Sequence, residues 1–250
     1  MIAESAGGPL TLTFLGTRGE IDIRSRRHKR HSSLLVQRGK ARIMIDCGAD
    51  WLGLAPRLAP TVVVLTHAHA DHAAGLAKGV PCPVYATRET WNSIRNFPIR
   101  ERRVLPLKRS VSIDGVRFTA FPVAHSLRAP AVGLRVATGG ECVFYVPDVA
   151  MVPDAARTLH RIDLYIGDGA TVTRSMVRTR DGILIGHAPV VAQLDWCKQA
   201  GVRRAIFTHC GSAIVRGDHR RLNATLRKLG QEHDVDARIA LDGDRLHFPQ

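Results

Sequence analysis

The segment that most restricts this chain joins a short apolar run to a dense group of metal-ligand side chains. Thr61–Leu65 is a continuous apolar and β-branched run, the pattern of a fully buried strand. It leads directly into Thr66-His67-Ala68-His69-Ala70-Asp71-His72. Three imidazoles and one carboxylate crowd this loop, and together they suit zinc and similar transition metals. A solvated polar loop is the alternative, but it gives no reason for four ligand-type residues in six positions.

The local geometry of this loop predicts two groups of ligands. Alternation along an extended segment places His67 and His69 on the same side. We expect the chain to turn after His69 into a short helix, so that Asp71 and His72 can face a second centre.

Short β-type runs dominate the first 150 residues, and strands alternate with helices after them. The predicted helices are Val190–Ala200 and Asp218–Leu229, with Asp218 as an N-cap and Gly230 just past the end. We expect a closing hairpin around Asp242-Gly243. The pattern indicates a layered α/β fold, and no linker or repeat divides residues 1–250, which favours a single domain. The predicted strands are Leu10–Leu15, Ser33–Gln37, Arg42–Ile45, Thr61–Leu65, Val84–Ala86, Val116–Phe121, Val132–Val136, Cys142–Val146, Asp163–Ile166, Arg204–Phe207, Arg238–Leu241 and Arg245–Phe248.

Charge and cysteine content narrow the class of protein. The chain has 36 Lys and Arg against 22 Asp and Glu, a net charge of +14, which attracts phosphates and polyanions without defining a fold. Its five cysteines show no CxxC spacing, which argues against a disulfide framework and favours reduced thiols in the cytoplasm. Met1–Pro9 lacks the pattern of a signal peptide, and no run approaches the roughly 18 apolar residues of a membrane span. We therefore expect a cytoplasmic protein without a membrane partner.

The segment His67–His72 resembles the HxHxDH signature of the metallo-β-lactamase superfamily. Four further residues match that family in order, each at a predicted strand end, and the resemblance extends from about Leu10 to Phe248. It implies an α/β fold of the four-layer αββα sandwich type, the metallo-β-lactamase fold. The matching residues are Asp46 in Ile45-Asp46-Cys47-Gly48, His125 in Ala124-His125-Ser126, Asp148 in Val146-Pro147-Asp148, and His209 in Thr208-His209.

The resemblance implies a role for each matching residue. Two divalent ions are expected, zinc first, with manganese or iron as alternatives. Asp46 would orient a ligand or the loop that carries it. The residues expected to take part in catalysis are Asp46, Asp71 and His187. The nucleophile of the implied hydrolysis would be a metal-bound hydroxide, so no Ser or Cys nucleophile is required. The expected ligands are His67, His69 and His125 for one ion, Asp71, His72 and His209 for the other, and Asp148 as a bridge between them.

His187, in Gly186-His187-Ala188-Pro189, is the candidate proton donor or phosphate contact. A histidine that opens a helix before the last ligand is similar to the phosphodiesterase branch of the family, which includes tRNase Z and the cyclic phosphodiesterase associated with carbon–phosphorus lyase. A helix-capping role is the alternative. Asp168, in Gly167-Asp168-Gly169, also ends a strand, and it suits either a tight turn or a place beside the site.

Two departures from these relatives leave the substrate open. His125 and Asp148 are 148 − 125 = 23 residues apart, which leaves no room for the long tRNA-gripping arm common in tRNase Z. The loop after the first strand lacks the cysteines of the cyclic phosphodiesterase and carries Arg24–Ser33 instead, a basic stretch. Arg26, Arg27 and Arg30 are therefore candidates for substrate binding, and a solvated loop is the alternative.

These features predict a dinuclear metal-dependent hydrolase, foremost a phosphodiesterase or nuclease. Its partner would be a cyclic or linear phosphodiester, RNA and DNA included, and related enzymes are often homodimers. A thioesterase or lactonase of the same fold is the first alternative. A non-catalytic nucleic-acid-binding module is the second, and the intact ligand set counts against it.

Overall fold

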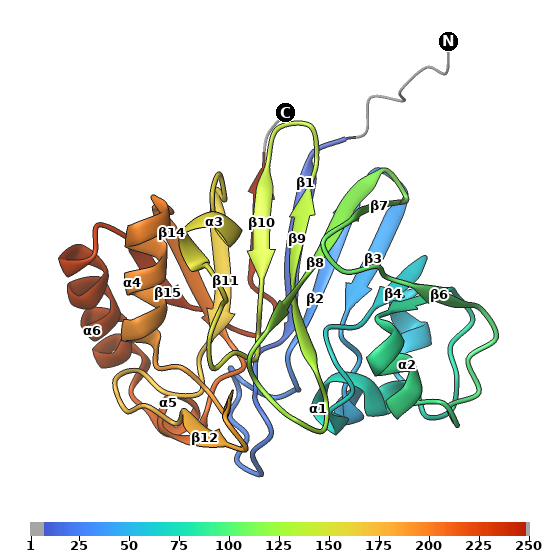
Figure 1. The fold of residues 1–250 in the computed structure, drawn as a ribbon, viewed down its shortest axis with the longest axis horizontal. Helices are drawn as coiled ribbons and strands as arrows, with labels where there is room; N and C mark the ends of the chain where they lie inside the picture. The colour runs from blue at the N-terminus through green and yellow to red at the C-terminus, as the bar shows by residue number, and fades with distance from the viewer. Residues whose placement is uncertain (1–7, 249–250) are drawn as a thin grey trace.

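The computed structural model describes residues 8–248 and folds them into two seven-stranded sheets packed face to face, with helices on both outer faces (Figure 1). The strand order is β16-β1-β2-β3-β4-β5-β6 in the first sheet and β15-β14-β11-β10-β9-β8-β7 in the second. Strands β12 and β13 form a separate pair. The predicted four-layer αββα sandwich is confirmed.

The bounds of the elements follow the chain. The first sheet contains β1 (Leu10–Gly16), β2 (Ser33–Arg38), β3 (Ala41–Ile45), β4 (Val62–Val64), β5 (Val84–Ala86), β6 (Arg102–Val104) and β16 (Arg245–Phe248). The second contains β7 (Ser110–Ile113), β8 (Val116–Val123), β9 (Ala131–Ala137), β10 (Cys142–Tyr145), β11 (Leu164–Asp168), β14 (Arg204–Thr208) and β15 (Asp236–Ile239); the separate pair is β12 (Arg178–Arg180) and β13 (Ile183–Ile185). The helices are α1 (Ala70–Ala73), α2 (Arg88–Ser93), α3 (Ala155–Thr158), α4 (Val190–Ala200), α5 (Ser212–Arg216) and α6 (His219–Glu232), with short 3-10 turns at Ala49–Trp51, Ala55–Leu58 and Ala74–Leu76.

Three apolar layers hold the sandwich together. The central layer lies between the sheets and includes Phe14 and Tyr145, both fully buried. A second layer packs helix α4 on the outer face of the second sheet through Leu194. A third packs Trp51 and Trp91 on the outer face of the first sheet. Side chains alternate along a strand, so each sheet contributes apolar side chains both to the central layer and to the layer on its outer face.

Parallel strands gather the carboxyl ends that carry the polar residues. Strands β3, β4 and β5 are parallel to one another, and so are β10, β11 and β14. Open α/β sheets bind ligands outside the carboxyl ends of parallel strands, because the loops there face the same way. The predicted metal-ligand residues follow these ends.

The predicted closing hairpin is wrong. Strands β15 and β16 belong to different sheets, so the chain crosses the sandwich at Asp242-Gly243 instead of turning back. The Asp242 carboxylate accepts from the Thr17 hydroxyl at 2.7 Å and from the amide of Lys29 at 2.8 Å. These partners lie more than two hundred residues earlier, so an Asp-Gly pair alone could not indicate them.

Helix α6 begins as predicted and ends later. The Asp218 carboxylate accepts from the amides of Arg220 and Arg221, as an N-cap does. The helix continues through Gly230 to Glu232. A Cβ at Gly230 would lie 2.3 Å from the Val235 carbonyl oxygen, so this glycine permits close packing and does not end the helix.

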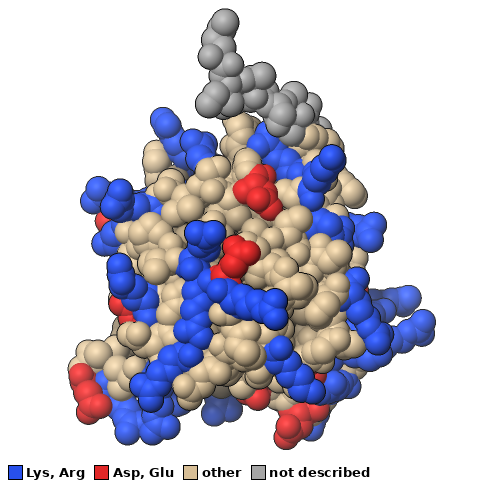
Figure 2. Space-filling view, turned by 90° about the vertical axis from the view of Figure 1, so that its right-hand side faces the viewer, with Lys and Arg blue, Asp and Glu red and all other residues tan. Residues whose placement is uncertain are grey.

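Positive side chains are spread over the surface. Figure 2 views the side of β6 and α2, where Lys and Arg are distributed over the face with wide uncharged areas between them. The exposed arginines in and around α2 include Arg88, Arg95 and Arg100. Within residues 8–248, no helix is long and apolar enough to cross a bilayer. All five cysteines are free thiols.

His28 is a buried histidine that connects the first loop to the crossover at Asp242. Its Nδ1 lies 2.8 Å from the Thr17 hydroxyl, and that hydroxyl donates to Asp242. His28 Nδ1 must therefore donate to Thr17, which sets the tautomer of the neutral ring. Burial lowers the pKa of His28 from 6.5 to about 4, with nearby His219 and Arg27 acting in the same direction.

Acidification should therefore destabilise the fold through His28. The unfolded state takes up this proton near pH 6.5 and the folded state only near pH 4, so stability falls as pH falls through that window. His28→Asn keeps an amide donor near the place of Nδ1. We expect it to reduce the loss of unfolding free energy between pH 7.5 and 4.5 by on the order of 2 kcal/mol. Denaturant unfolding at both pH values measures this. An unchanged loss would contradict it, and His160→Asn, at an exposed histidine, is the control.

Candidate metal centre

Two neighbouring strand ends of the first sheet deliver half of the polar cluster. Asp46 follows β3 and has a left-handed backbone, with φ of 60°. The His67–His72 segment follows β4, and α1 begins within it at Ala70. A Cβ on Gly48 would lie 1.8 Å from the Asp71 carbonyl oxygen, so this glycine lets the two segments touch. The expected short helix after His69 is confirmed.

The second sheet delivers the other half. His125 follows β8, Asp148 follows β10, and Asp168 is the last residue of β11. His209 follows β14, also with a left-handed backbone at φ of 52°. All four side chains are buried. The predicted residues from both sheets thus meet at one end of the sandwich.

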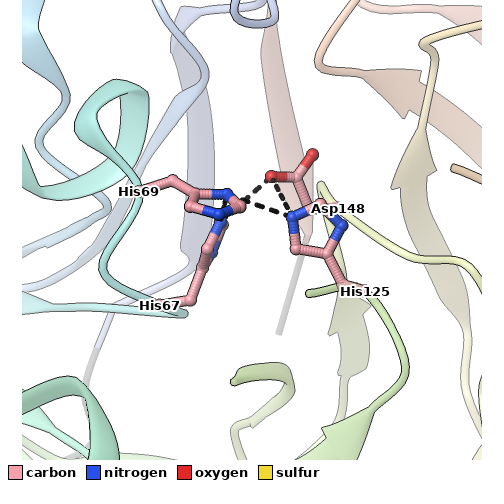
Figure 3. Close-up of side chains that lie close together, drawn as sticks. All are labelled: His67, His69, His125 and Asp148. Carbon is pink, nitrogen blue, oxygen red and sulfur yellow. Dashed lines mark hydrogen bonds and ion pairs between the residues drawn. The ribbon is translucent and has the colours of Figure 1, made fainter. Parts of the chain in front are cut away.

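The first group of ligand atoms comes from three histidines and one aspartate (Figure 3). Asp148 Oδ2 lies 3.1 Å from His67 Nε2 and 3.3 Å from His125 Nε2. His69 Nδ1 lies 3.0 Å from His67 Nε2 and 3.2 Å from His125 Nε2. The ligand atoms lie within 4.8 Å of one another.

The second group shares Asp148 with the first. Its other members are Asp71, His72 and His209, again within 4.8 Å of one another. His72 Nε2 lies 3.1 Å from Asp148 Oδ2 and 3.2 Å from Asp71 Oδ2. His209 Nε2 lies 3.0 Å from Asp71 Oδ2. The two groups therefore meet at the Asp148 carboxylate.

Several buried atoms of this centre lack hydrogen bonds. His72 Nε2, His209 Nδ1 and Asp148 Oδ1 have no hydrogen-bond partner among the described residues. Yet His209 Nδ1 and Asp148 Oδ1 are only 2.9 Å apart. Buried polar atoms are almost always bonded, so these atoms require another partner. A cation between them would supply it, and the set of imidazole and carboxylate donors fits a transition metal.

Asp46 fixes the orientation of His72. Its carboxylate lies 2.8 Å from His72 Nδ1 and also accepts from the amide and hydroxyl of Thr66. His72 Nδ1 therefore donates to Asp46, and Nε2 faces the centre as an acceptor. Asp46 belongs to neither ligand group. The predicted orienting role matches this geometry.

Burial and neighbouring charges shift the pKa values of the cluster in opposite directions. Burial lowers the pKa of His67 well below its usual range, and His72 adds to this effect, so the His67 ring is neutral. Burial acts to raise the pKa of Asp148, but His209, His125 and His72 outweigh it and hold that pKa well below its usual range. Metal ligands must be neutral imidazoles or ionised carboxylates, and His67 and Asp148 have these forms. Burial acts to lower the pKa of His72 and of His209, but the carboxylates around them outweigh it and raise both pKa values well above 6.5, so a bound ion would displace these protons.

Asp168 holds His187 beside this centre. Asp168 Oδ2 lies 2.7 Å from His187 Nδ1 and accepts from the Val149 amide at 3.1 Å. Burial acts to lower the pKa of His187, but Asp168 outweighs it and raises the pKa above its ordinary value. The His187 ring packs between those of His125 and His209, at centroid distances of 5.2 and 5.5 Å. Of the two roles open to Asp168, the one beside the site matches the structure.

A cavity of about 660 Å³ opens above the cluster. Its floor contains His69, Asp148 and His187, and its walls include Glu20 and Arg174. Both wall residues are exposed, and no sequence motif marks either of them.

A buried ion pair shapes the wall that carries Glu20. Arg18 is 2% exposed, and its guanidinium lies 2.6 Å from Asp50. It also donates to the carbonyls of Gly19 and Ile21, which line the cavity. Arg18 therefore fixes this wall, and sequence reasoning missed it because its partner is 32 residues away.

The three predicted substrate-binding arginines do not line the cavity. Arg30 stacks on Trp51, with its guanidinium carbon 4.5 Å from the ring centroid. Arg26 and Arg27 are exposed, and the Arg27 carbonyl accepts from the Asp242 amide, at the crossover between sheets. The basic loop is thus held by backbone contacts, and its role in binding stays a prediction.

Residues 41–210 match the family described as the beta-lactamase superfamily domain, which is more than half of the chain. The chain therefore belongs to this superfamily. A solved structure of a diphosphatase from the PhnP family has a TM-score of 0.75 at 21% identity, covering 97% of this chain and 98% of that one, and it shows the same fold.

Two curated relatives match over shorter stretches. A ribonuclease Z from Methanopyrus kandleri is 30% identical over 146 residues, which are 52% of this chain and 50% of that protein. A UPF0173 metal-dependent hydrolase from Methanoculleus marisnigri is 29% identical over 117 residues, which are 42% of this chain and 51% of that protein. The aligned stretches span about half the length of each relative.

Exchange of Asp46 for Asn should weaken metal binding without removing a ligand. An amide nitrogen facing His72 Nδ1 donates where the carboxylate accepts, and it shifts the ring proton to Nε2, which can then no longer bind a metal. We expect Asp46→Asn to lower Zn²⁺ affinity by about 10- to 100-fold. Competition with a chelating dye measures this, with unfolding curves as the check on folding. Wild-type affinity in a folded variant would show that Asp46 does not set the His72 tautomer.

Proposed function

We propose that this protein is a dinuclear metal-dependent phosphodiesterase. The observation that carries the proposal is the sharing of Asp148 by three groups of possible ligands, two built on the His67–His72 segment and a third that contains His187, Asp168 and His209. His187 is held by Asp168 in the third group, and we assign it to proton transfer. Zn²⁺ suits the donors best, and Mn²⁺ and Fe²⁺ are alternatives. The five free thiols support a reducing compartment such as the cytoplasm.

The ligands divide as the two groups do. His67, His69 and His125 would hold one ion, and Asp71, His72 and His209 the other. Asp148 would contact both, because its two oxygens face different members of the cluster. Two such ions supply an activated water and neutralise charge on the attacked phosphate.

His187 would protonate the leaving group. Its Nδ1 proton is engaged by Asp168, so Nε2 is the atom that can deliver a proton into the cavity. Burial acts to lower the pKa of His187, but the Asp168 carboxylate favours the charged ring and raises that pKa above its ordinary value. Asp168 is therefore a positioning residue, and His187 is the proposed general acid.

The relatives support phosphate-ester chemistry. The matched solved structure is named a diphosphatase, and one curated relative is named a ribonuclease. The partner would be a phosphodiester, either a small molecule or a stretch of RNA or DNA. A homodimer, as in many related enzymes, is part of the same proposal.

Activity should depend on loaded metal. We expect metal-loaded protein to hydrolyse bis-p-nitrophenyl phosphate and chelator-treated protein to lose this activity. Parallel assays with S-lactoylglutathione and an acyl lactone test the thioesterase and lactonase alternatives. Absence of phosphodiester turnover with Zn²⁺, Mn²⁺, Co²⁺ and Fe²⁺ would refute the proposal, and faster thioester or lactone turnover would replace it.

Removal of His187 should reduce rate more than metal content. We expect His187→Ala to lower kcat by about 10²- to 10⁴-fold for a phenyl phosphodiester, whose leaving group needs a proton. The loss should be smaller for a p-nitrophenyl ester, whose leaving group departs without one. Steady-state kinetics and metal analysis measure both effects. Asp148→Ala is the comparison, because it should lose metal and rate together. Equal losses on both esters would exclude the role as acid.

A further inference from the structure

The cavity above the metal centre has a simple charge pattern. Beyond the metal-ligand residues and His187, its charged lining residues are Glu20 and Arg174. The rest of the wall is small or apolar and includes Ile21, Met176 and Ala213. Although the chain carries a net charge of +14, a single Lys or Arg side chain from residues 8–248, Arg174, lines this cavity.

Arg174 lies on a segment whose two ends are both fixed at the centre. At its start, the Gly169 amide donates to the Thr208 carbonyl at 2.6 Å. At its end, the Met176 amide donates to the His187 carbonyl at 3.2 Å. The segment between them therefore keeps a defined position over the metal site.

The Arg174 guanidinium has no protein partner in the described part of the chain. It appears in none of the hydrogen bonds, ion pairs or ring stacks found there. Other arginines near the first loop differ: Arg18 and Arg24 pair with Asp50, and Arg30 stacks on Trp51. A guanidinium that lines a cavity without a partner is available to an anionic ligand.

The same pattern does not fit a long polyanion lying in the cavity. Binding of a nucleic-acid strand is dominated by many Lys or Arg contacts to phosphates. Here one Lys or Arg side chain lines the cavity, which is enough for one anionic group beyond the metal centre and too few for a row of phosphates. A volume of about 660 Å³ lies within the range of about 300–1,000 Å³ typical of small-molecule sites.

We propose that Arg174 determines specificity by binding a second anionic group of a small organic phosphodiester, whose scissile phosphate sits at the metal centre. This proposal rests on the proposed function and narrows its substrate class. The uncharged part of the substrate would lie on Ile21, Met176 and Ala213. RNA and DNA strands would be poor substrates by comparison.

A matched pair of nucleotide esters tests this proposal. The first is thymidine 5′-(p-nitrophenyl phosphate), and the second carries an additional 3′-phosphate. We expect metal-loaded wild-type protein to prefer the second in kcat/KM by about tenfold, the size of one partly exposed charge-assisted bond. Arg174→Gln should abolish this preference and change the first substrate little. Arg174→Lys should keep part of it. Arg178→Gln, at an exposed arginine outside the cavity, is the control.

Two outcomes would overturn the proposal: no preference of the wild-type protein for the second ester, or a preference that Arg174→Gln leaves unchanged, whether or not both rates fall. Failure of the phosphodiesterase function would look different, because wild-type protein would then hydrolyse neither ester. Calorimetric binding of thymidine 3′,5′-bisphosphate and of thymidine 5′-monophosphate to metal-loaded protein decides the role of Arg174 in that case. A preference for the bisphosphate that Arg174→Gln removes would support it, and no such preference would reject it.

Discussion

The structure depends on the compensation of buried negative charge where the two sheets meet. Asp46, Asp71, Asp148 and Asp168 are each at most 2% exposed. A buried carboxylate costs several kcal/mol unless it is paired and hydrogen-bonded. For Asp71 and Asp148 the partners include residues of the opposite sheet: Asp71 of the first sheet meets His209 of the second at 3.0 Å, and Asp148 of the second meets His67 of the first at 3.1 Å. The centre is therefore also what fixes the strand-end loops of one sheet relative to those of the other.

Much of the centre could be predicted because its residues sit at strand ends. His67–His72 follows a buried run, and alternation with a turn separates its members into two groups, as the structure shows. Asp148 and His209 are single residues without a local signal, so only their order along the chain and the family resemblance identified them. The strands were largely predictable from their apolar residues. These residues alternate or run together where the strand packs into the core, so the sequence pattern reflects burial.

What sequence could not supply are contacts between distant residues. Arg18 carries no pattern, yet its ion pair with Asp50 shapes the cavity wall. The Asp242-Gly243 pair has the composition of a hairpin turn, but bonds to Thr17 and Lys29 make it a crossover. The charge of +14 pointed to the basic loop, whereas the cation that lines the cavity is Arg174. Composition gives the total charge of the chain. Only the fold shows which charged side chains line the cavity.

An aspartate–histidine contact occurs twice at the centre, once on each sheet, and the two histidines differ in exposure. Asp46 accepts from His72 Nδ1, and Asp168 faces His187 Nδ1 in the same way, at 2.8 and 2.7 Å. Each aspartate holds its histidine through Nδ1 and leaves Nε2 free of this contact. His72 is fully buried among carboxylates, so its Nε2 suits a metal, whereas the His187 side chain is 22% exposed in the cavity and can meet a substrate. The same carboxylate contact thus holds one imidazole in a fully buried place and the other in a partly exposed one at the cavity.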